Sequence, residues 1–134
     1  MVSEISADLI VSGGHEFKPA EVLEKFGLAA DAIWHIGDRI GRSCRRRKCN
    51  AWVISTGSLK GHSLSGCLAM LFKKVESRWR DLRAVCSREG METQVSIAVY
   101  VYDEAPEMLC SREDVRRMAE LKAEMDIDVV MLGA

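Results

Sequence analysis

The stretch Thr93–Asp103, TQVSIAVYVYD, is the longest run of strict alternation in the chain. Valine or isoleucine takes every second position from Val95 to Val101, and small or aromatic residues take the positions between. A period of two residues, with β-branched and aromatic side chains throughout, is typical of a strand inside a sheet. The valine row therefore predicts an apolar sheet face that neighbouring helices cover.

Shorter periodic segments on both sides of this strand predict the rest of the fold. Further strands are expected over residues 4–11, 32–36, 51–55 and 127–131, and helices over residues 19–27, 64–86 and 111–125. The order β-α-β-β-α-β followed by α-β predicts an α+β two-layer sandwich. Its core would be ferredoxin-like, with the helices on one face of a mainly antiparallel sheet and an added C-terminal α-β unit.

Apolar stripes with helical spacing define the buried sides of the two longer helices. The first is expected to run unbroken for about six turns, with Cys67, Leu71 and Cys86 buried and Lys74 on the solvent side. Ser111 is the predicted N-cap of the last helix. The stripe of that helix comprises Val115, Met118, Leu121 and Met125.

Length and composition predict one domain over residues 1–134 and a soluble protein. The chain is 48% hydrophobic and 29% charged, and its net charge of −1 gives no general attraction to nucleic acids or membranes. The first residues lack the basic and apolar regions of a signal peptide, and no apolar run approaches the roughly 20 residues that span a bilayer. The odd number of cysteines, five, argues against a secreted disulfide framework. We therefore expect a cytoplasmic protein with reduced thiols.

Cys44 and Cys49 enclose four cationic residues in the segment between the second and third strands. Structural zinc sites usually need closely spaced cysteine pairs, and cations beside a dication are unfavourable. The same cations lower thiol pKa values, so these two cysteines should be reactive. A reversible disulfide and two unpaired loop cysteines remain as alternatives, and we predict no metal site and no cofactor.

The segment between these strands is strongly basic, although the chain as a whole is nearly neutral. Its candidate partner-binding residues are Arg42, Arg45, Arg46, Arg47 and Lys48. This charge density fits either an acidic surface of another protein or a phosphate backbone. Nucleic-acid binding usually needs a wider basic field, which favours the protein partner.

Tyr100 and Tyr102 are the other candidate partner-binding residues, because both lie on the strand face opposite the valines. Aromatic residues on the open face of a ferredoxin-like sheet stack on bases in RNA-binding modules. The glycine-aromatic signature of those modules is absent here. We therefore favour an interpretation in which the tyrosines close the sheet face against the added helix or a second subunit, so that a homodimer is compatible with the sequence.

The chain resembles the bacterial domain of unknown function 4279 family along nearly its whole length. The matching positions are Pro19, Glu21, Phe26, Gly27, Leu28, Trp34, Gly37, Asp38, Arg39, Trp52, His62, Val99, Tyr100, Val101, Pro106, Leu109, Ser111, Met118, Leu121, Asp126, Ile127 and Asp128. The resemblance implies a small stand-alone α/β protein and points to immunity or other interaction roles. The Cys44–Cys49 segment departs from the family pattern by being more basic.

No segment matches a catalytic motif: the contexts of His15 and His62 resemble neither a nucleophile elbow nor a phosphate loop. We therefore predict a non-enzymatic interaction protein that binds a macromolecular partner by surface complementarity, using the basic loop. The most specific form of this prediction is an inhibitor-like or immunity-like role. The alternative is a nucleic-acid-binding module that uses the basic loop and the tyrosine face, and the third class is an enzyme without an assignable residue set.

Overall fold

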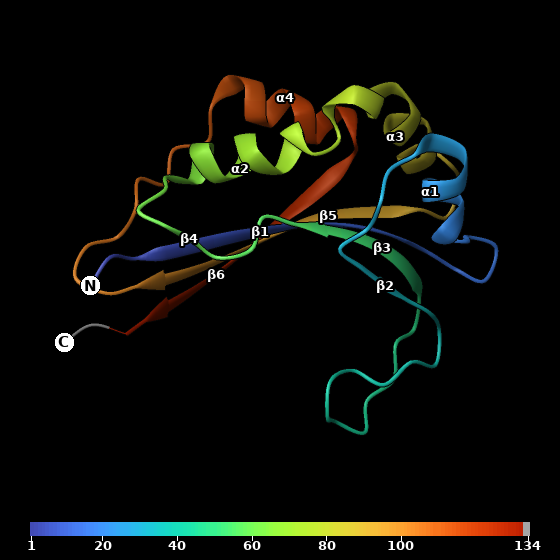
Figure 1. Cartoon of the computed structure of the whole chain (residues 1–134), viewed down its shortest axis with the longest axis horizontal. Coiled ribbons are helices and arrows are strands. Elements are labelled where there is room, and N and C mark those ends of the chain that lie inside the picture. Colours follow the sequence, from blue (N-terminus) through green and yellow to red (C-terminus); the bar gives the residue numbers. More distant parts are fainter. Residues whose placement is uncertain (133–134) are drawn as a thin grey trace.

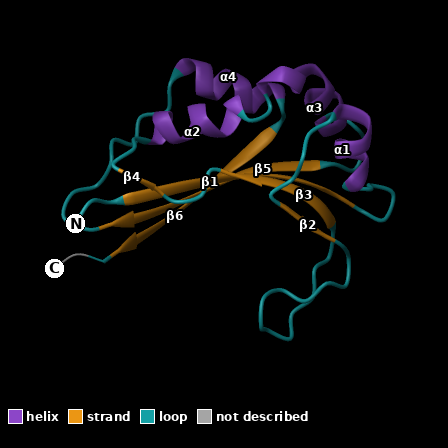
Figure 2. Cartoon of the chain, viewed as in Figure 1, coloured by secondary structure: helices purple, strands orange, loops and turns teal. Residues whose placement is uncertain are grey.

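A computed structural model describes residues 1–132 as one curved sheet with helices on one face (Figure 1). The strands are β1 (Glu4–Gly13), β2 (Ala32–Trp34), β3 (Asn50–Ser55), β4 (Leu59–Lys60), β5 (Glu92–Val101) and β6 (Ala123–Met131). The helices are α1 (Ala20–Phe26), α2 (Leu64–Lys73), α3 (Trp79–Cys86) and α4 (Arg112–Glu120), and a short 3-10 turn (Glu76–Arg78) precedes α3. The predicted α+β sandwich with helices on one face is confirmed (Figure 2).

The sheet has the strand order β2-β3-β1-β5-β6, and the short β4 pairs with the start of β1. β1 runs antiparallel to both β3 and β5, and β2 runs antiparallel to β3. These pairings are those of a ferredoxin-like split βαβ unit. β6 lies parallel to β5, as a strand must when a helical crossover joins it to its neighbour, and α4 supplies that crossover.

The valine row of β5 forms the centre of the core, as the alternation predicts. Val95, Ile97, Val99 and Val101 are all at most 3% exposed. They pack in one cluster with apolar side chains of β1, α2 and α3. Trp52 on β3 is completely buried in the same cluster, and its indole N–H donates a hydrogen bond of 3.2 Å to the carbonyl oxygen of Leu28.

The prediction of one unbroken helix over residues 64–86 is wrong, because the chain breaks between α2 and α3. Val75 adopts φ −118° and ψ 0°, and its N–H donates to Phe72 in a 3-10 geometry. Val75 is nevertheless fully buried, and the ring of Trp79 meets that of Phe72 edge-on at 5.8 Å. A 3-10 turn keeps residues three apart on one side, so the apolar stripe continues through the break. Periodicity alone therefore could not reveal the change in direction.

The prediction that the last helix extends to Met125 is also wrong. The helix ends at Glu120, and Lys122 takes a left-handed conformation with φ 55° that turns the chain into β6. Met125 therefore lies on a strand, and Val115 is 54% exposed instead of buried. No glycine marks the end of this helix, and its apolar spacing continues into the strand. The sequence pattern therefore predicts an end of the helix that is too late.

Lys74 lies on the solvent side of the α2–α3 junction, as predicted, but it is not free of interactions. Its ammonium group lies 2.6 Å from Oδ2 of Asp31 and 2.6 Å from the carbonyl oxygen of Ser55. The Ser55 N–H also donates to Asp31 Oδ2, at 2.7 Å. The hydrogen bond from Lys74, followed by that from Ser55, lowers the pKa of the Asp31 carboxyl. The pair therefore joins the helix layer to the β2 side of the sheet.

We expect Lys74→Ala to lower the free energy of unfolding at pH 7 by about 0.5 kcal/mol, the usual worth of an exposed ion pair. The pKa of Asp31 is lower in the folded state, so its contribution is present above the unfolded-state pKa and disappears as the pH falls through the folded-state pKa. Urea unfolding at pH 7 and at pH 3 should therefore show the difference from wild type narrowing in acid. A constant difference at both values would contradict this account, and Lys73→Ala is the matched control.

Candidate functional site

The segment between β2 and β3 is a hairpin that projects away from the body of the sheet (Figure 1). We call residues 35–49 the basic arm. Backbone hydrogen bonds hold its two sides together: Ile40 N–H donates to Arg45 at 2.9 Å, and Arg47 N–H donates to Asp38 at 2.7 Å. Gly37 N–H in turn donates to the carbonyl oxygen of Arg47 at 2.9 Å. The arm is therefore an ordered two-sided structure rather than an open loop.

Polar side chains fix the root of the arm to the rest of the fold. The buried side chain of Asn50 accepts a hydrogen bond from Ile36 N–H at 2.8 Å. Its amide group donates to the carbonyl oxygens of Phe17 at 3.0 Å and Gly14 at 3.2 Å. One side chain thus joins the arm to the turn after β1. Sequence reasoning did not single out Asn50, because these partners are distant along the chain.

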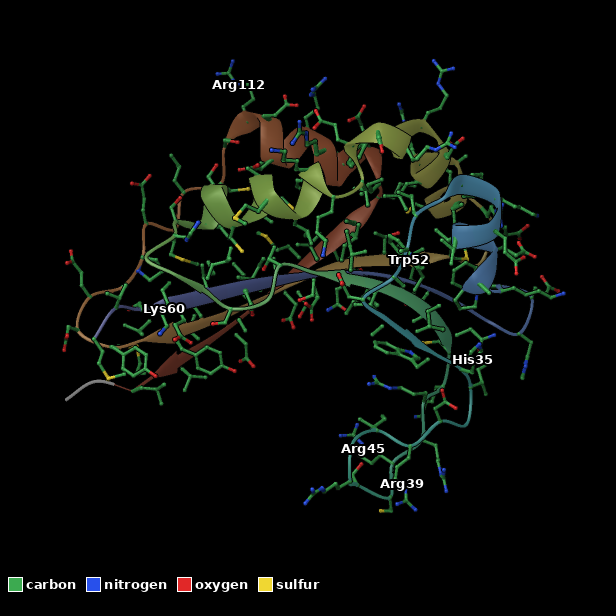
Figure 3. The ribbon with its side chains drawn as sticks, in the orientation of Figure 1. His35, Arg39, Arg45, Trp52, Lys60 and Arg112 are labelled. Atoms are coloured by element: carbon green, nitrogen blue, oxygen red, sulfur yellow. The ribbon has the colours of Figure 1, made fainter. Side chains whose placement is uncertain are left out.

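The five predicted cations all lie on the basic arm, and most of them face solvent. Arg42, Arg45, Arg46 and Lys48 are exposed, and Figure 3 shows Arg45 near the tip. Arg47 differs, because its guanidinium carbon lies 3.6 Å from the centroid of the Trp34 ring. Such a cation–π contact stabilises the Arg47 side chain in its position over the Trp34 ring. Arg47 is therefore part of the arm's own structure.

The arm carries one further cation that the sequence analysis did not name as a site residue. Arg39 pairs with Arg46 through a backbone bridge and lies beside Arg45 in the projecting part (Figure 3). Among residues 1–132, no arginine or lysine of the arm forms an ion pair. The only carboxylate of the arm, Asp38, accepts a hydrogen bond from His35 N–H at 2.7 Å. The positive charge is therefore open to a partner.

A shallow hollow of about 460 Å³ lies against the arm. Trp34 and Ile40 give it an apolar part, and the segment from Arg45 to Cys49 supplies cationic groups. The indole N–H of Trp34 is buried and has no acceptor among the described residues. Arginine and lysine side chains are donors only, so this wall can bind carboxylate or phosphate oxygens next to an apolar group.

The structure does not bring the tyrosines to the basic arm. Tyr100 pairs with Glu4 near the start of β1, and Glu4 pairs on its other side with Lys60. The arm enters β3 at Asn50, which pairs with Gly13 at the opposite end of β1. Figure 3 shows this separation, with Lys60 far from the labelled arginines of the arm. The two predicted sets of partner-binding residues are therefore at opposite ends of the sheet.

The interpretation that the tyrosines close a sheet face against the added helix is wrong. Val99 and Val101 are buried under the helices, so Tyr100, which lies between them, points to the opposite face. Tyr100 is 39% exposed there. Tyr102 is partly buried just beyond β5, and its N–H donates to the Ser3 hydroxyl at 3.1 Å. A second subunit on this face stays a prediction.

Comparison with known proteins identifies the family. The family model described as "Domain of unknown function (DUF4279)" matches residues 3–132. The chain belongs to the DUF4279 family. No curated protein and no solved structure matches it.

The cysteines of this DUF4279 protein fall into two environments. Cys44 is exposed in the turn at the tip of the arm, and Cys49 is partly buried at its base. The hydrogen bonds that hold the arm together lie between them, so a disulfide joining these two residues would require the arm to open. Cys67 and Cys86 are buried, and burial raises the pKa of both thiols. Within residues 1–132, no three side chains of the metal-binding types converge.

We expect thiol labelling to distinguish these environments. In the native protein an alkylating reagent should modify Cys44 within minutes, whereas Cys67 and Cys86 should react only after unfolding, because they are inaccessible and rarely ionised. Mass spectrometry of peptides from a time course gives the order. Protection of all cysteines that a chelator removes would instead indicate a metal site.

No helix in the described part of this DUF4279 chain combines the length and the apolar character that crossing a bilayer requires.

Proposed function

We propose that this DUF4279 protein is a non-enzymatic interaction protein of the cytoplasm, and that its basic arm binds an acidic surface of a partner protein. One observation carries the proposal: an ordered, projecting hairpin presents a dense set of cations without ion-pair partners in the described chain. Exposed charge of one sign raises association rates with a surface of opposite sign. An inhibitor-like or immunity-like protein needs such complementarity.

The arrangement of charge favours a protein partner over nucleic acid. A long polyanion needs a continuous basic surface, whereas the net charge of this chain is −1. The open sheet face, which a ferredoxin-like RNA binder uses, carries the carboxylates of Glu124, Asp126 and Asp128 on β6. Its tyrosines lie at the far end from the arm. A compact acidic patch on a protein fits the arm without meeting these carboxylates.

The experiment compares two variants that lose the same charge at different places. Arg42→Ala, Arg45→Ala and Lys48→Ala remove three exposed cations from the arm but keep the contact between Arg47 and Trp34. Arg80→Ala, Arg88→Ala and Arg112→Ala remove three exposed cations from the helix side. We expect the arm variant to bind its partner about tenfold more weakly, mostly through a slower association rate, and the control variant to bind as wild type does.

The partner is identified by affinity capture in the native host with nuclease treatment. Surface plasmon resonance at two salt concentrations then measures the affinity and the association rate of the purified pair. Both triple variants should unfold at nearly the wild-type temperature, because their replaced side chains are exposed. Equal loss of binding in the two variants would contradict a role of the arm. Tight binding of DNA or RNA, with an affinity that falls steeply with salt, would favour the nucleic-acid function.

A further inference from the structure

β6 forms the outer edge of the sheet opposite the basic arm, and its outer backbone groups are unpaired within residues 1–132 (Figure 1). Just past this strand, Leu132 N–H donates to the carbonyl oxygen of Val101 at 2.7 Å. Backbone groups alternate along a strand, so the even-numbered residues bond to β5 and the odd-numbered ones point outward. Met125, Ile127 and Val129 thus each present an N–H and a carbonyl oxygen to solvent.

The two faces of β6 differ in chemistry. The helix-side face carries an apolar row in which Met125 and Ile127 are each 40% exposed, Val129 is 53% exposed and Met131 is 71% exposed. The opposite face carries Glu124, Asp126 and Asp128 at alternate positions, all of them exposed. The strand contains no proline or lysine, two residues that commonly protect an edge from pairing.

The carboxylates argue against a second copy of the same strand as the occupant of this edge. In a two-fold antiparallel pairing, any register centred on residues 124 to 128 sets at least one carboxylate directly opposite another. Like charges directly opposite destabilise such a pair. Registers centred after residue 128 avoid this contact but pair only the C-terminal ends of the two β6 strands. Opposite charges in these positions are favourable, so the edge fits a strand with cations where β6 has carboxylates.

We propose that the outer edge of β6 binds an extended segment of a partner protein in which cationic and apolar residues alternate. The segment adds a strand to the sheet: the outward groups of Met125, Ile127 and Val129 bond to its backbone. Its apolar side chains cover the exposed row, and its lysines or arginines lie opposite Asp126 and Asp128. This edge is separate from the basic arm, so the molecule has two binding surfaces of opposite charge.

A labelled ten-residue peptide of alternating lysine and valine tests the proposal by fluorescence anisotropy with the full-length protein. A scrambled peptide of the same composition and an alternating glutamate–valine peptide are the controls. We expect the alternating lysine peptide to bind at least about tenfold more tightly than either control. The double variant D126K/D128K should reverse the preference between the lysine and glutamate peptides.

Amide hydrogen exchange tests the backbone pairing between β6 and the peptide in the wild-type protein, without any substitution. In the free protein the amides of Ile127 and Val129 should exchange fast and those of Asp126 and Asp128 slowly, since only the latter bond to β5. The lysine peptide should slow the fast pair at least tenfold. Ile127→Pro removes one outward N–H but no bond to β5, so it should abolish binding, whereas Ile127→Ala should only weaken it.

Three results would overturn the proposal: no binding of the alternating peptide, equal binding of the scrambled peptide, or a dimer in solution that Ile127→Pro dissociates. The last would assign the edge to a second copy. The arm variant with Arg42, Arg45 and Lys48 replaced should bind the peptide as wild type does. Failure at this edge is therefore distinct from failure of the function proposed for the arm.

Discussion

Leu71→Ala should lower the free energy of unfolding by about 3 kcal/mol, and Val99→Ala by about 2 kcal/mol. Leu71 on α2 is completely buried, and Val99 on β5 is 1% exposed in the same cluster. Each truncation removes apolar contacts and leaves a cavity between the helix layer and the sheet. Urea unfolding monitored by tryptophan fluorescence measures both changes.

The matched control is Lys73→Ala, which lies two residues after Leu71 on the exposed side of α2. Its unfolding midpoint should stay within the error of the wild-type value, because surface replacements rarely exceed about 0.5 kcal/mol. Equal midpoints for all three variants would contradict the packing of the helix layer on the sheet.

Asp114→Ala should lower the free energy of unfolding by about 2 kcal/mol, although α4 lies on the outside of the molecule. The Asp114 carboxylate is 3% exposed and accepts hydrogen bonds from Ser111 N–H at 3.0 Å and from the Ser65 hydroxyl at 2.8 Å. The first bond completes the capping box of α4, and the second joins α4 to α2. Alanine would leave both donors without their acceptor.

Two further substitutions, one at the same position and one beside it, make this test specific. Asp114→Asn keeps an acceptor oxygen and should recover part of the lost stability. Glu113→Ala removes an adjacent carboxylate whose ion pairs, among the described residues, are with the exposed Arg116 and the partly buried Arg117 of its own helix, so its effect should stay small. If all three variants unfold at the same urea concentration, the capping box does not stabilise the helix pair.

The fold was predictable where one local pattern decides one element. Alternation identified β5 and β1, and Ser111 identified the start of α4, because each signal lies within a few residues. The break at Val75 and the end of α4 at Lys122 were not predictable in this way. Both depend on how a helix must bend or stop to follow a twisted sheet, and the apolar spacing continues across both positions.

The candidate site was predictable only in its composition. The cluster of cations is visible in the sequence, and the structure places all five predicted ones on the arm. The ordered structure of the arm was not predictable, because Asn50 at its root bonds to Gly14 and Phe17, which lie 36 and 33 residues earlier. The contact between Arg47 and Trp34 likewise forms only once β2 pairs with β3.

The position of β1 between β3 and β5 has a consequence during translation. β1 leaves the ribosome before the other strands of this sheet, yet its partners on β5 lie 80 to 96 residues farther along the chain, from Ser12 with Glu92 to Glu4 with Tyr100. At about 5–20 residues per second, synthesis of that interval takes roughly 4 to 19 seconds. A nascent chain that has emerged as far as β3 therefore exposes one full edge of β1, which stays open until β5 arrives.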